Sequence, residues 1–299
     1  MTPRSRIVRT LFALAVVLAI VATAAVWRVH RATNPPLADS SGIDFASMKI
    51  PVEEIEFRAT DGVSLRGWWI PGEPGNAPLV LCHDRAERKD RLINLALELH
   101  REGFPVLLFD FRGHGESQAA TSTFGIHEKR DVLGAIDAVE RLAPQARDIG
   151  IFGVGMGAQA AVLAAGDRST VRVLVLDRLD REPEVAMQQT FFSGWEFASD
   201  RLAFLPRRIF GLMHDGSAQE RAENRIDQLP GRSVLMLAPA NDPRLTEEMK
   251  SLVRRIPDDV ESDGNLVVLP TTLGNQLYGD QLDRYHERVS TFFRERLRG

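Results

Sequence analysis

Cysteine is almost absent from the sequence: Cys82 is the only one among 299 residues. An intrachain disulfide is therefore impossible, and a single thiol does not decide between an oxidising and a reducing compartment. Clusters of cysteine and histidine are also missing, as is the His-Glu-x-x-His pattern of zinc enzymes. We therefore expect no metal ion and no other cofactor.

Acidic residues are missing from residues 1–31, which contain five arginines. Because the whole chain has a net charge of −4, residues 32–299 carry a net charge of −9. Charge of that sign opposes contact with a phosphate backbone, so we expect no nucleic-acid partner. The basic N-terminus instead favours an anionic membrane surface.

A long apolar run, Leu11–Trp27, follows the basic N-terminal residues 1–10 and contains one polar residue, Thr23. As a helix this run would be roughly 25 Å long, slightly shorter than a hydrocarbon core of about 30 Å. An aromatic residue at its end suits the membrane interface. We expect residues 11–27 to be a transmembrane signal anchor in a single-pass protein, followed by a linker at residues 28–48.

A cleaved signal peptide is the alternative interpretation of this N-terminal segment. Ala22-Thr23-Ala24 has the small-x-small form of a cleavage site, and cleavage there would give a secreted protein. For an uncleaved anchor, three arginines precede the apolar run and two follow it closely. That bias places the N-terminus inside and the domain on the extracytoplasmic side.

From Lys49 onward, short apolar stretches typical of strands alternate with amphipathic stretches typical of helices. Strands are expected at Val52–Arg58, Val63–Ile70, Leu79–Cys82, Val106–Asp110, Asp148–Phe152, Val171–Leu176, Ser233–Leu237 and Leu266–Leu269. Helices are expected at Arg91–Arg101, His127–Leu142, Ala158–Ala165, Leu245–Arg255 and Gln281–Leu297. The pattern predicts an α/β domain at residues 49–299, with a mostly parallel central sheet and helices on both faces.

Two parts of the domain depart from this alternation. The turn Asp61-Gly62 joins the first two strands as a hairpin, so antiparallel strands are expected at one edge of the sheet. Residues 181–230 contain several aromatic residues and no clear strand pattern. We expect a helical cap insertion there.

Four motifs follow one another along the domain. In order, they are Asp61–Trp69, the D-x-R-G-H-G-x-S run Asp110–Ser117, the glycine-rich turn Gly153–Gly157, and Asn241-Asp242-Pro243. Together, over about residues 50–295, they resemble the α/β-hydrolase fold superfamily. The resemblance is to the serine-hydrolase branch with membrane-tethered monoacylglycerol-lipase-like and S33-peptidase-like proteins. It implies the α/β-hydrolase fold and esterase, lipase or peptidase chemistry by a catalytic triad.

In this family the glycine-rich turn is a strained strand-to-helix elbow that presents the nucleophilic serine. Gly155 stands in that position here, and a glycine has no oxygen with which to attack a carbonyl. The flanking Gly153 and Gly157 are both present. The turn also lacks the Gly-x-Gly-x-x-Gly spacing of dinucleotide-binding loops, so no nucleotide is expected.

The oxyanion hole of the family combines a backbone N–H of the residue after the nucleophile, here Met156, with a donor from the loop after the third strand. The family begins that loop with His-Gly, whereas this chain has His83 and Asp84. A carboxylate near the hole would repel a developing oxyanion. Alternatively, Asp84 faces solvent or pairs with Arg85 or Arg88.

Two further triad positions are implied by the resemblance. Asp242 matches the acid, although an Asp before a Pro is equally well explained as the N-cap of the next helix. Asn275 is the best match to the base, because the sequence has no histidine between His214 and His286. An amide does not titrate and cannot act as a general base. We expect His286 on the surface of the last helix, and the loop residues His83 and His114 to be hydrogen-bonded supports.

These residues support three hypotheses. The first is a non-catalytic, membrane-tethered homologue that binds an acyl or lipid-like ligand. The second is an active ester or amide hydrolase with a non-standard nucleophile, Cys82 or Ser193. The third is an interaction role for the aromatic residues of the cap, with a protein partner that the sequence does not identify.

Overall fold

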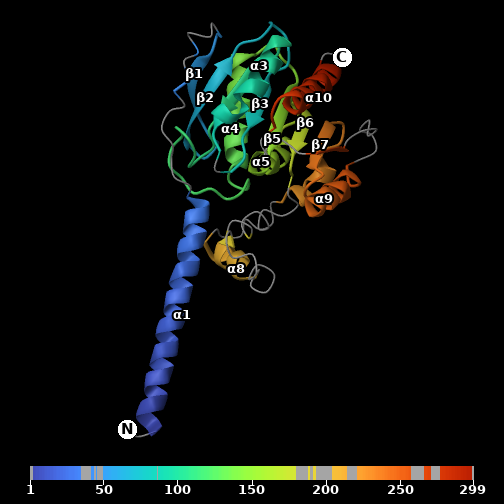
Figure 1. The fold of residues 1–299 in the computed structure, drawn as a ribbon. Coiled ribbons are helices and arrows are strands. Elements are labelled where there is room, and N and C mark those ends of the chain that lie inside the picture. Colours follow the sequence, from blue (N-terminus) through green and yellow to red (C-terminus); the bar gives the residue numbers. More distant parts are fainter. Residues whose placement is uncertain are drawn as a thin grey trace.

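Eight described strands form one sheet in the computed structural model, in the order β1-β2-β4-β3-β5-β6-β7-β8 (Figure 1). They are β1 Glu53–Arg58, β2 Ser64–Ile70, β3 Leu79–Cys82, β4 Val106–Phe109, β5 Ile149–Val154, β6 Val171–Asp177, β7 Ser233–Pro239 and β8 Leu266–Leu269. β1 and β2 form an antiparallel hairpin, and β2 runs antiparallel to β4. All other neighbouring pairs are parallel. The mostly parallel sheet with an antiparallel edge is therefore confirmed.

The structure describes residues 3–34, 42–43, 45, 50–85, 87–179, 188, 191–192, 204–213, 221–256, 266–270 and 277–297. The α-helices in this part of the chain are α1 Pro3–Thr33, α3 Ile93–Arg101, α4 Lys129–Leu142, α5 Met156–Ala165, α8 Phe204–Met213, α9 Pro243–Val253 and α10 Asp280–Leu297. Three short 3-10 helices accompany them: η1 Lys89–Leu92, η4 Ala222–Asn224 and η5 Ile226–Gln228.

Two apolar clusters lie on opposite faces of the sheet. Successive side chains of a strand point to opposite faces, so Val80 joins one cluster and Leu81 the other. The first cluster contains residues of α4, α5 and α9, and the second contains residues of α3 and α10. Each fully buried leucine contributes about 1.5–3 kcal/mol relative to an exposed one. The predicted cover of helices on both faces is confirmed.

Helix α1 extends beyond the expected apolar span at both ends and leaves the domain as one long helix (Figure 1). Within the described residues it is the one helix long and apolar enough to cross a membrane. Its side chains are exposed over most of the apolar run. Its last turn, which the sequence assigned to the start of the linker, is helical and buries Val29, Ala32 and Thr33.

The region expected to form a cap is described in part. α8 lies beside the C-terminal part of α1 (Figure 1), and the two helices are in contact. Phe210 of α8 packs with Ala32 of α1 and Phe124 of the domain. The segments 180–187, 189–190, 193–203 and 214–220 lie outside the described residues. The described part is thus helical where it meets α1.

The expected surface position of His286 is wrong. Its side chain is only 8% exposed, and its ring lies 6.1 Å from that of Tyr285 on the same helix. The buried stripe of α10 is formed by Tyr285, Val289 and Phe293 at helical spacing, and His286 lies on the flank of that stripe. Burial lowers the pKa of His286, against the smaller opposite effect of Glu98 and Asp283.

Candidate functional site

The elbow is formed where β5 ends at Val154 and α5 begins at Met156. Gly155 lies between them with φ +52° and ψ −111°, in the region that favours glycine. A Cβ at Gly153 would lie 2.6 Å from the carbonyl oxygen of Gly157, and one at Gly157 would lie 2.6 Å from a carbonyl oxygen of the loop after β3. Both flanking glycines are therefore required by close backbone packing.

The Asp84 side chain occupies the space above this elbow. Its Oδ1 accepts hydrogen bonds from the backbone N–H of Met156 at 2.9 Å and from that of Arg85 at 2.7 Å. A Cβ on Gly155 would lie 2.5 Å from Asp84 Cγ and closer still to Oδ1. The carboxylate thus lies where a nucleophilic side chain on the elbow would be.

Two backbone N–H groups that converge on one oxygen at these distances have the geometry of an oxyanion hole. The donors are Met156 and Arg85, so Asp84 itself contributes its carboxylate as the acceptor. The other carboxylate oxygen lies 3.7 Å from Arg178 Nη1 at the end of β6. The Asp84 carboxylate therefore lies where these two N–H groups converge, with Arg178 as its guanidinium partner.

His83 fixes the backbone of the loop that carries Asp84. Its Nε2 accepts the Phe111 N–H at 3.1 Å, which leaves Nδ1 to donate to the Asp84 carbonyl oxygen at 2.7 Å. Burial lowers the pKa of His83 to about 3, and the neighbouring His114 acts in the same direction. His114 is also buried, with Nδ1 2.8 Å from the Arg112 carbonyl oxygen. Both histidines are neutral structural supports.

An ion cluster around the buried Lys89 holds the far end of the same loop. The Lys89 ammonium lies 2.6 Å from Asp110 and 2.5 Å from Glu116, and 4.7 Å from the centre of the Trp68 ring. The Lys89 N–H also donates to Asp110 at 2.8 Å. Since Lys89 follows the loop after β3, and Asp110 and Glu116 belong to the loop after β4, these two loops are fixed against one another.

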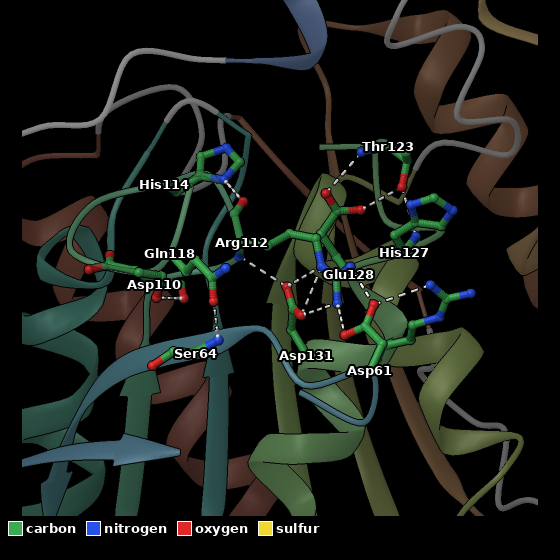
Figure 2. Close-up of polar contacts among 12 residues, drawn as sticks. Asp61, Ser64, Asp110, Arg112, His114, Gln118, Thr123, His127, Glu128 and Asp131 are labelled. Carbon is green, nitrogen blue, oxygen red and sulfur yellow. Dashed lines mark hydrogen bonds and ion pairs between the residues drawn. The ribbon is translucent and has the colours of Figure 1, made fainter. Parts of the chain in front are cut away.

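Arg112 anchors the loop after β4 to the rest of the domain, as Figure 2 shows. Its guanidinium forms bonds to Asp131 of α4 at 2.6 Å and to Asp61 of the β1–β2 turn at 2.8 Å. Charge-assisted pairs of this kind are stronger than neutral hydrogen bonds. The motif residues that the sequence singled out, Asp61 and Arg112, therefore form a scaffold beneath the site.

Comparison with known proteins finds similar sequences over part of the chain. A family model described as serine aminopeptidase, S33, matches residues 73–177. The uncharacterized protein YfhR of Escherichia coli is 32% identical over 133 residues, which cover 42% of this chain and 46% of that protein. The match therefore spans less than half of this relative.

Solved structures match over more of the chain. The esterase Pf2001 of Pyrococcus furiosus has a TM-score of 0.71 at 19% identity and covers 90% of this chain and 99% of its own. The alpha/beta hydrolase GrgF of a Penicillium species has a TM-score of 0.65 at 16% identity, over 84% of this chain and 100% of its own. This chain has the α/β-hydrolase fold.

The structure describes one of the two other triad positions that the resemblance implied. Asp242 caps α9: its Oδ1 accepts the Leu245 N–H at 3.0 Å, and Pro243 is the first helical residue. The structure thus shows the capping role that the sequence offered as one of two explanations. Asn275, the expected base position, lies outside the described residues.

The structure describes one of the two alternative nucleophiles that the sequence suggested. Cys82 is fully buried in the apolar cluster that contains α4 and α5. Burial, with a smaller contribution from Asp131, raises the pKa of its thiol. A thiol in such surroundings does not react as a thiolate, so Cys82 is not a nucleophile. Ser193 lies outside the described residues.

Glu87, which sequence analysis did not single out, lies close to Asp84 and gives the site a pH-dependent group. Burial first, and then the charge of Asp84, raise its pKa to about 7, although Arg91 and Arg178 act in the opposite direction. The ordinary value of the group is 4.5. Because the folded chain binds this proton more tightly than the unfolded chain, folding stability should fall as the pH rises from about 5 through about 7.

We expect Glu87→Gln to remove this loss of stability. At pH 8 the variant should be more stable than the unchanged chain by about 2 kcal/mol, and at pH 4 the two should agree. Denaturant unfolding of the detergent-solubilised chain at both pH values measures the difference. Glu54→Gln, at an exposed position of β1, is the matched control. A Glu87→Gln effect that is the same at both pH values would contradict the prediction.

Proposed function

We propose that this chain is a membrane-anchored α/β-hydrolase-fold protein that lacks hydrolytic activity at its elbow and acts by binding. The Asp84 carboxylate, hydrogen-bonded to Met156 and Arg85 against Gly155, carries the proposal. A tetrahedral intermediate needs those two N–H groups for its own oxyanion, and a resident negative charge opposes it. The amide at Asn275, inferred from the sequence alone, supports the same conclusion.

For this binding role, the ligand class that we favour is an acyl or lipid-like molecule. Ligands of open α/β sheets bind outside the carboxyl ends of the strands, where the elbow lies. Helix α8, with Phe204 60% exposed, lies beside the anchor on that side of the domain. An apolar, membrane-resident molecule would therefore reach this region without crossing water. A protein partner for the cap region is the second form of the binding hypothesis.

A fluorophosphonate probe for serine hydrolases tests the absence of activity. The full-length chain in detergent should remain unlabelled under conditions that fully label an active serine hydrolase used as the positive control. Stoichiometric labelling would overturn the proposal. In that case, loss of labelling and of p-nitrophenyl ester turnover in Ser193→Ala would identify the hydrolase with a non-standard nucleophile.

The membrane anchor is tested separately by fractionation. We expect the chain to remain in carbonate-washed membranes at its full mass of 33.3 kDa and to need detergent for release. The physical reason is that α1 exposes a long apolar surface. A lipid bilayer buries this surface, whereas contact with water is unfavourable. A shorter chain in the aqueous fraction would instead show that the segment is a cleaved signal peptide.

A further inference from the structure

The last turn of α1 is bonded to the loops of the site. The Thr33 carbonyl oxygen accepts the Ser122 N–H at 2.7 Å, and the Ala32 carbonyl oxygen accepts a hydrogen bond from Arg85 Nη1 at 3.2 Å. The final carbonyl groups of a helix have no partner inside the helix. Here the domain supplies partners for two of them, so the end of α1 has a specified position on the domain.

Arg85 connects this turn directly to the hole. Its backbone N–H donates to Asp84, while its guanidinium bonds to Ala32 and lies 5.3 Å from the centre of the Phe124 ring. Phe124 packs in turn with Ala32 and with Phe210 of α8. One residue thus holds both the carboxylate in the hole and the end of the anchor.

Met156 is connected to the same turn through one intermediate residue. Ser122 donates its N–H to Thr33 and its hydroxyl to Met156 Sδ at 3.3 Å, and the Met156 N–H is the second donor to Asp84. The segment after Ser122 is held by Glu128, which accepts N–H groups of residues 123 and 125 at 2.9 and 2.8 Å; Figure 2 shows the Thr123 contact. Both donors of the hole are therefore tied to the C-terminal turn of α1.

We propose that Ala32 and Thr33, in the last turn of α1, act as an anchor clamp that keeps Asp84 in the oxyanion hole. The inference concerns regulation of the site and rests on the proposed function. When the anchor is docked, Arg85 and Met156 are held on Asp84 and the hole is closed. When a ligand or a partner displaces the end of α1, both N–H groups lose their support, and a carboxylate or ester group of a membrane ligand competes with Asp84 for them.

Hydrogen–deuterium exchange at the Arg85 and Met156 amides of the full-length chain in lipid nanodiscs tests the clamp. Ala32→Glu places a charge in the buried contact of α1. It should speed exchange of both amides by roughly five- to thirtyfold, the factor for losing one or two hydrogen bonds. His30→Glu adds the same charge at an exposed position of the same turn. It should change exchange by less than about twofold.

A second variant keeps the test independent of folding defects. Arg85→Ala removes the side-chain contact with Ala32 but keeps the backbone N–H, and it should also speed exchange of the Met156 amide. Protection of the β5 amides, such as that of Ile151, reports whether the sheet is intact. Unchanged exchange in both Ala32→Glu and Arg85→Ala, with β5 protected, would overturn the clamp. Rapid exchange in the unchanged chain would show that Asp84 does not fill the hole, which is a failure of the proposed function itself.

Discussion

Gly155→Ser should give an inactive protein that is less stable than the unchanged chain by about 2–4 kcal/mol. A serine at Gly155 brings its Cβ to 2.5 Å from Asp84 Cγ, and it must adopt a φ of +52°. Its hydroxyl also has no base to take its proton. The carboxylate must leave the hole, or the elbow must shift, and either change breaks the hydrogen bonds to Met156 and Arg85.

A double-mutant cycle separates the clash from the backbone strain. Asp84→Gly in the Gly155→Ser background should restore roughly 2 kcal/mol, because the atoms that the new side chain meets are removed. Gly279→Ser is the matched control: Gly279 has φ +53°, and a Cβ there would meet no atom within 4 Å. Denaturant unfolding in detergent gives the free energies. Additive effects of Asp84→Gly and Gly155→Ser would contradict the pairing of these two positions.

Much of the sheet could be predicted because buried strands have an obvious pattern. The apolar runs Leu79–Cys82 and Leu266–Leu269 are strands with the expected bounds. Helix starts were harder to predict. α5 begins at Met156, two residues before the expected start, because Gly157, which the sequence assigned to the glycine-rich turn, is part of the helix. α9 likewise begins before its apolar pattern, at Pro243, and Asp242 is the N-cap of this helix.

The position of Asp84 could not be predicted from local pattern. It depends on β3 and β5 being neighbours with Cys82 opposite Gly153, which places the two loops after these strands side by side. Strand order is a property of the whole fold, and hydrophobic periodicity does not encode it. The docking of Ala32 and Thr33 escaped prediction for a similar reason. The linker composition begins just after them, and their partners Arg85 and Ser122 lie 53 and 89 residues later in the chain.

The triple variant Gly155→Ser, Asp84→Gly and Asn275→His should hydrolyse p-nitrophenyl butyrate measurably, whereas each single variant should not. Asp84→Gly vacates the two N–H groups, Gly155→Ser supplies the nucleophile, and Asn275→His supplies the base at the position that the family pattern implies. Even enzymes that lack a triad member keep about 10³–10⁴-fold catalysis over water from the oxyanion hole and binding. Opening the hole is therefore as necessary here as restoring the nucleophile.

Asp242 provides the sharpest control for this restored triad. A carboxylate can accept several hydrogen bonds at once, so Asp242 can cap α9 through Oδ1 and still orient a new histidine. Asn is also a good N-cap, so Asp242→Asn in the triple variant should leave stability nearly unchanged. It should lower turnover by up to about 10⁴-fold, because the amide favours the wrong tautomer of the histidine. Turnover that is insensitive to Asp242→Asn would show that another group orients the base.

If Gly155→Ser alone turned over substrate with an apparent pKa near 7, a histidine elsewhere in the chain would be the base, and the assignment of Asn275 would be wrong.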